Sequence, residues 1–218
     1  MNDNIIVKYI WRKEPMMNQN TALNELTNTI KEKNHFNYNY SPSEVDNLAL
    51  ELLACLGFNS KDIATPIVKV GKALEFQIYK ENLESNLSGD IYINGDTRDV
   101  YGYNRVILVN KNDALYHQRF VIAHELAHYF FDFLGNPKYE DVSEKFSDTY
   151  YKDSHDTLQE KRANRFAASI LMPEESFIYQ YNQAKLADYN RMFVITYLSR
   201  FFETTVDSIE KRIMEVAI

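Results

Sequence analysis

The sequence contains 218 residues, of which 45 % are hydrophobic and 25 % are charged, and its formal net charge is −7. These values are typical of a globular protein with one sizeable core, and the negative charge argues against a dedicated nucleic-acid-binding protein. A single cysteine, Cys55, excludes a disulfide framework or a cysteine metal cluster within the chain.

Neither a secretory signal nor a membrane-spanning segment is expected. The apolar residues of the first 15 positions are interrupted by Lys8, Arg12 and Lys13, and no run in the sequence approaches 18 apolar residues. Together with the lone cysteine, this pattern favours a reducing, cytoplasmic location.

Residues 1–40 are expected to form a poorly defined N-terminal extension, with a weak helical pattern at about 21–33. The first strong signal is Ser41-Pro42-Ser43-Glu44, because it combines a Ser N-cap, a Pro in the first turn and a Glu that completes a capping box. Apolar residues then recur at the helical period until Gly57. This stretch predicts a packing helix.

Between residues 63 and 110 the pattern changes to short β-like runs at 67–70, 74–78, 91–93 and 106–109, separated by glycines. They predict a small mixed or antiparallel sheet of three or four strands. Residues 105–109 or 90–94 are candidates for an edge strand that holds a peptide backbone by strand addition. The alternative is an ordinary strand within the sheet.

The most informative stretch is His124-Glu125-Leu126-Ala127-His128, on a helix predicted at about 116–133. Positions i and i+4 share one helix face, so His124 and His128 can bind one metal ion while Glu125 lies beside them. The alternative is a pair of core histidines. The helix itself is apolar on nearly all sides, so it is expected to be buried, and buried polar groups need partners, which favours the metal.

A polar, acidic stretch at 138–156 shows no clear period and is expected to be a disordered segment or a lid. It contains His155, Tyr150 and Tyr151, any of which could stabilise the transition state in the cleft. The sequence does not choose among them.

A capping-box pattern beginning at Asp156-Thr157 starts another helix, which Pro173 ends. Glu160 and Asn164 lie on the same side as its apolar face. Glu160 is either a metal ligand or a first-turn acid favoured by the helix dipole, and the residues alone leave these two interpretations evenly balanced. Asn164, one turn later, is placed to hydrogen-bond a metal ligand.

The remaining sequence predicts helices at about 174–186, 191–202 and 206–216. The last two, joined by Glu203-Thr204-Thr205, resemble a helix-turn-helix. Two ordinary packing helices are the favoured interpretation, because the pair carries no basic stripe.

The stretch from Arg119 to His128, followed by the one from Glu160 to Pro173, resembles the ImmA/IrrE family of zinc metallo-endopeptidases. The resemblance covers about residues 45–215 and implies an α+β, zincin-like fold, with a metallopeptidase domain at 41–186 and a C-terminal helical pair at 187–218. It also implies one Zn²⁺ per chain held by His124, His128 and Glu160, with Glu125 as the catalytic acid/base. Ala127 and Glu203 stand where the family usually has Gly, and Arg162 replaces a frequent second Glu.

The resemblance further implies a protein substrate, namely a helix-turn-helix transcriptional repressor encoded nearby, whose cleavage relieves repression. Three functions are compatible with these features. The first is this zinc endopeptidase, and the second is a zinc-bound antirepressor that sequesters the repressor without efficient cleavage. The third, direct DNA binding through the C-terminal helices, is disfavoured by the acidic charge. The presence of Glu125 favours the peptidase, since binding alone does not need that carboxylate.

Overall fold

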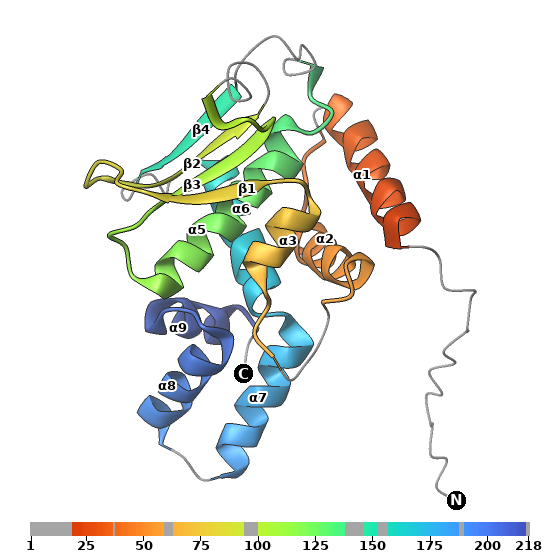
Figure 1. The fold of residues 1–218 in the computed structure, drawn as a ribbon. Helices are drawn as coiled ribbons and strands as arrows, with labels where there is room; N and C mark the ends of the chain where they lie inside the picture. Colours follow the sequence, from red (N-terminus) through yellow and green to blue (C-terminus); the bar gives the residue numbers. More distant parts are fainter. Residues whose placement is uncertain are drawn as a thin grey trace, which may run out of the picture.

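The computed structural model describes residues 19–36, 38–58, 63–93, 100–137, 146–151, 157–187 and 190–216 (Figure 1). Its helices are α1 (Gln19–His35), α2 (Pro42–Cys55), α3 (Ile67–Ala73), α5 (Leu115–His128), the π-helical turn η1 (Tyr129–Phe133), α6 (Leu158–Leu171), α7 (Glu174–Leu186), α8 (Arg191–Phe202) and α9 (Val206–Glu215). Its strands are β1 (Gln77–Glu81), β2 (Leu87–Ile93), β3 (Arg105–Asn110) and β4 (Phe146–Tyr151). This content confirms the α+β class.

The N-terminal helices begin as their sequence signals predict. Helix α1 includes the expected 21–33 segment. Helix α2 has the full capping box, in which the Ser41 side chain accepts a hydrogen bond from the Glu44 amide and the Glu44 carboxylate accepts one from the Ser41 amide at 2.9 Å. Buried Leu48, Leu52 and their apolar neighbours face the core from α2.

The prediction of a strand at 67–70 is wrong, because these residues form α3. A short apolar run fits a strand and a buried helical turn equally well, and here Ile67 and Val70 are fully buried on one helix face. The strand expected at 74–78 begins only at Gln77, since Glu75 has a φ of 67° in the turn that leaves α3.

The four strands form one mixed sheet in the order β1-β3-β2-β4. Strand β1 is parallel to β3, whereas β2 runs antiparallel to both β3 and β4. The prediction of an edge strand at 105–109 or 90–94 is therefore wrong, because β3 and β2, which contain the described residues of these segments, are the inner strands. The edges are β1 and β4. The error arose because β4 lies in the polar 138–156 stretch, whose sequence gave no strand signal.

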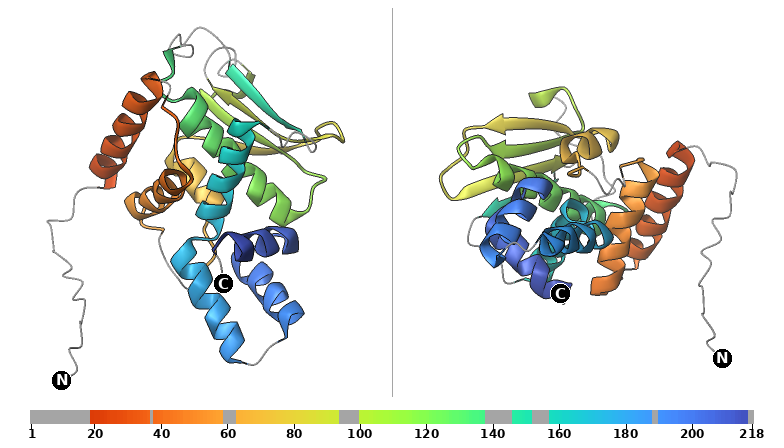
Figure 2. Two further views of the ribbon diagram at one scale, coloured as in Figure 1. Left: turned by 180° about the vertical axis from the view of Figure 1, so that it is seen from behind. Right: turned by 90° about the horizontal axis from the view of Figure 1, so that it is seen from below.

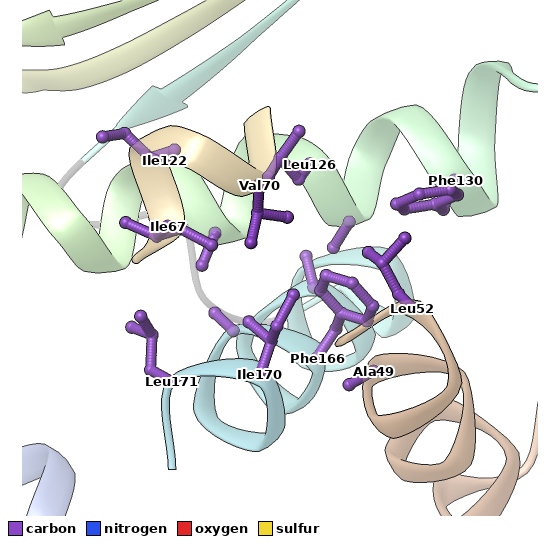
Figure 3. Packing of buried hydrophobic residues seen from close by; sticks show 14 of the residues in the cluster. Ala49, Leu52, Ile67, Val70, Ile122, Leu126, Phe130, Phe166, Ile170 and Leu171 are labelled. Carbon is purple, nitrogen blue, oxygen red and sulfur yellow. The ribbon is translucent and has the colours of Figure 1, made fainter. Parts of the chain in front are cut away.

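The core lies between the sheet and a layer of helices. Helix α5 runs beneath the sheet, and α6 packs beside it together with α2 and α3 (Figures 1 and 3). Figure 3 shows Phe130, Phe166 and Ile170 filling the space between η1, α6 and the neighbouring helices. All three are completely buried. The close packing of α5 on α6 brings the two predicted metal-binding helices together.

Helices α7, α8 and α9 form the end of the molecule away from the sheet (Figure 2). As predicted, the residues at 203–205 join α8 to α9, and Glu203 adopts the left-handed conformation with a φ of 52°. This pair packs on the end of α6, since the buried Arg212 guanidinium donates to the Met172 carbonyl at 3.2 Å. No helix in the described ranges has the length and apolar character needed to cross a membrane.

Candidate metal centre

Helix α5 brings His124 and His128 together, as their spacing predicts. Their side chains are 0 % and 3 % exposed. The two Nε2 atoms face each other 2.9 Å apart. Two imidazole nitrogens at this distance either share a hydrogen bond or face a common partner.

Glu160 reaches the same point from the first turn of α6. Thr157 caps this helix by accepting a hydrogen bond from the Glu160 amide at 3.1 Å, which fixes where the turn begins. The Glu160 carboxylate lies 3.3 Å from His124 Nε2 and 3.4 Å from His128 Nε2. The structure thus brings Glu160 to the histidines, not into solvent, and the three side chains form a group that can hold a metal ion.

The outer nitrogens of both imidazoles have acceptor partners. His124 Nδ1 lies 3.0 Å from the Asn164 amide oxygen, and His128 Nδ1 lies 2.8 Å from the Asp132 carboxylate. Because both acceptors are oxygens without a proton, each Nδ1 donates, and a neutral imidazole then presents the Nε2 lone pair. Asn164 takes the position expected of it.

The three inner atoms fit a tetrahedral zinc ion. Ligand atoms that lie 2.0–2.1 Å from one tetrahedral ion are about 3.3 Å apart. The observed separations of 2.9, 3.3 and 3.4 Å agree with this edge length. Two nitrogens and one carboxylate oxygen are also the donor set of catalytic zinc sites, which leave a fourth position open.

Electrostatics support the same fit. Burial lowers the pKa of His124, so this imidazole is neutral at pH 7. Burial raises the pKa of Glu160, whereas protons on the facing His124 and His128 nitrogens would lower it to about 2, and a bound cation would act in the same direction. A largely buried carboxylate beside two nitrogen lone pairs is a site that a cation stabilises.

Asp132 is the residue that the sequence interpretation missed. It lies in η1, and its carboxylate bridges His128 Nδ1 and the Arg162 guanidinium, which is 2.5 Å away. The available signal was its i+4 spacing from His128. Arg162, which replaces a frequent Glu of the family, therefore pairs with Asp132 on the side away from His128.

Glu125 is completely buried where β2 crosses α5. A Cβ at Gly89 would lie 3.2 Å from Glu125 Oε1 and only 2.3 Å from Val121 Cγ1. Only glycine therefore fits at this crossing, and the backbone of β2 closes one side of the space around the Glu125 carboxylate.

A second contact beside this crossing was not predicted. The pairing of β2 with β4 shifts register between Leu87 and Gly89. At this bulge, the buried Ser88 hydroxyl lies 2.9 Å from His117 Nε2. Bulges often redirect a side chain next to an active site. His117 lies two helical turns before His124, so both belong to the same face of α5.

The three candidates for transition-state stabilisation remain predictions. The backbone of Tyr150 pairs with Gly89, and that of Tyr151 pairs with Leu87. This register places β4 next to the strand that touches Glu125. The side chains of both tyrosines, and His155 as a whole, lie outside what the structure describes.

Comparisons with known proteins complete the picture. A family model described as the IrrE N-terminal-like domain, Peptidase M78, matches residues 76–214, which is well over half of the chain. A solved structure of a Mycobacterium tuberculosis transcriptional regulator is similar with a TM-score of 0.47 and 16 % identity, over 88 % of this chain and 51 % of that one. This chain thus spans about half the length of that regulator. None of the curated proteins compared with the chain matches it.

Proposed function

Because the chain belongs to the IrrE N-terminal-like family of M78 peptidases, we propose that it is a zinc-dependent endopeptidase. The observation that carries this proposal is the spacing of 2.9–3.4 Å among the inner atoms of His124, His128 and Glu160. These residues would hold one zinc ion per chain. When bound, zinc supplies a Lewis acid and lowers the pKa of a coordinated water to about 7.

Glu125 is the proposed acid/base. Its carboxylate is buried at the β2 crossing, next to His124 in sequence, where it can accept a proton from the attacking water. The same group then returns the proton to the leaving amine of the cleaved peptide. Asn164 and Asp132 hold the imidazoles in the tautomer that this chemistry needs.

The substrate proposed is a protein, in particular a helix-turn-helix repressor encoded nearby, whose cleavage relieves repression. The corrected sheet topology supports β4, in place of the two inner strands, as the edge for substrate binding. Strand β4 is an edge of the described sheet, and its neighbour Gly89 lies against Glu125. A peptide added along β4 would extend the sheet two strand positions from β2, whose Gly89 lies against Glu125.

The deciding experiment is incubation of the zinc-loaded protein with the neighbouring repressor, with Glu125→Gln as the matched control. Cleavage by the wild type but not by the variant is expected, because the variant keeps the side-chain volume and lacks the proton acceptor. A stable complex without cleavage by either protein would instead identify an antirepressor that acts by sequestration.

A further inference from the structure

We propose that the groove along the outer side of α6 binds an acidic segment of the protein substrate, and that Lys161 and Lys211 determine this specificity. The inference rests on the proposed peptidase function and adds the chemical class of the segment that is recognised. The groove has a volume of about 1120 Å³ and is bordered by the 39–45 segment, α6 and α9. It is large enough for several residues of an extended peptide.

The groove reaches the metal centre through two of its lining residues. Asn164 lines it and hydrogen-bonds His124 at 3.0 Å. Phe120 lines it as well, and its ring centroid lies 6.3 Å from that of His124. Since an extended chain advances about 3.3 Å per residue, a peptide in the groove would place side chains a few positions from the cleaved bond here.

The groove is positive, although the chain as a whole has a net charge of −7. Its lining includes two carboxylates and five cationic side chains, namely Lys161, Arg162, Arg165, Lys211 and Arg212. Carboxylates already hold the three arginines, through the pairs Arg162–Asp132, Arg165–Asp46 and Arg212–Glu215. After these pairs the lining retains two lysines, Lys161 and Lys211, against one carboxylate, Asp207, so the charge that is available to a ligand is positive.

Lys161 and Lys211 are both exposed and, within the described ranges, neither forms an ion pair. Two available ammonium groups suit a short acidic peptide segment better than a nucleic acid, whose phosphate backbone is usually met by a larger array of cations. The groove also leads to the candidate metal centre of a chain whose family model is described as Peptidase M78, which further favours a peptide.

The test measures binding of two labelled 12-residue peptides to the zinc-loaded Glu125→Gln protein. One peptide contains four Glu residues, and the other has Gln at the same four positions. Fluorescence anisotropy gives both dissociation constants at low and high salt. We expect the acidic peptide to bind about five- to thirtyfold more tightly, and this preference to shrink in ~0.5 M salt.

Lys161→Glu combined with Lys211→Glu should abolish the preference. The matched control is Lys69→Glu combined with Lys185→Glu, since both of these lysines are exposed, do not line the groove and give the same change in net charge. The control should retain the preference. Equal affinity for the two peptides, no binding of the acidic one up to about 1 mM, or an equal loss in both double variants would overturn the proposal.

A DNA duplex serves as a competitor. If it binds more tightly than the acidic peptide, and does so through Lys161 and Lys211, the groove is a nucleic-acid site and the proposal is wrong. The groove proposal and the proposed peptidase function can be refuted independently. Cleavage of the repressor without any preference for acidic peptides removes the inference alone, whereas acidic preference without cleavage removes the peptidase assignment alone.

Discussion

Replacing Asp132 with Ala should weaken zinc binding without touching any of the three inner atoms. The Asp132 carboxylate accepts a hydrogen bond from His128 Nδ1 at 2.8 Å, and losing such an outer partner typically costs about ten- to hundredfold in metal affinity. Asn164→Ala removes the corresponding uncharged acceptor, the amide oxygen that accepts a hydrogen bond from His124 Nδ1 at 3.0 Å. Hydrogen bonds to charged groups are worth about 1.5–3 kcal/mol and neutral ones about 0.5–1.5 kcal/mol. The zinc affinity of Asn164→Ala should therefore fall by only about two- to tenfold.

Competition with a chromophoric chelator would measure both zinc affinities, and circular dichroism in the presence of excess metal would check that each variant is folded. Arg162→Gln is the control, because it removes the partner of Asp132 on the far side and leaves the bond to His128 in place. Its zinc affinity should stay within about threefold of the wild type. An unchanged affinity in Asp132→Ala, or a larger loss in Asn164→Ala than in Asp132→Ala, would refute this account of the centre.

Three further predictions follow from close approaches and from a helix cap. Gly89→Ala should reduce the proposed peptidase activity while zinc still binds, because its Cβ would lie 2.3 Å from Val121 Cγ1 and displace β2 from Glu125; unchanged turnover at equal zinc occupancy would contradict this. Gly135→Ala should lower the free energy of unfolding, measured in urea, by at least ~1 kcal/mol. Residue 135 has a φ of +72°, which disfavours any side chain, and the added Cβ would lie 2.5 Å from the Lys31 backbone. Hydrogen bonds from the Ser41 backbone and from Tyr38 lower the pKa of Glu44 from 4.5 to about 2, so its ionised form stabilises the fold above pH 4.5 and this contribution is lost as the pH falls toward 2. The difference in melting temperature between wild type and Glu44→Gln should therefore be greatest above pH 5 and shrink in acid; a difference that grows in acid would exclude this explanation.

The sequence predicts those parts of the site that local rules determine. The spacing of His124 and His128 requires only a helix, and the caps at Ser41 and Thr157 follow from their own side chains. Glu160 was undecided from the residues alone, because a first-turn acid has a favourable place with or without a metal. The packing of α5 on α6 brings it to the histidines, and no local pattern contains that information.

The features that sequence analysis missed depend on pairing across the fold. Strand β4 has a polar sequence and is defined by its partner β2, so neither it nor the correct sheet edge could be recognised from periodicity. The contact between Ser88 and His117 depends on a bulge in the same pairing. Helix α3 was mistaken for a strand because seven residues are too few to separate the two periods.

The π-helical turn connects the N-terminal helix with the candidate metal centre. In η1 the Leu134 amide donates to the Tyr129 carbonyl, five residues earlier, so the Phe130 carbonyl loses the partner that it would have in an α-helix. The buried Asn34 amide of α1 donates to both the Phe130 and Leu134 carbonyls at 2.6 Å. Since a buried carbonyl without a donor costs about 1–3 kcal/mol, Asn34 stabilises the π turn against the regular helix. That turn presents Asp132 to His128, so Asn34, which lies outside the matched range of 76–214, is linked to the candidate metal centre by two successive hydrogen-bonded contacts.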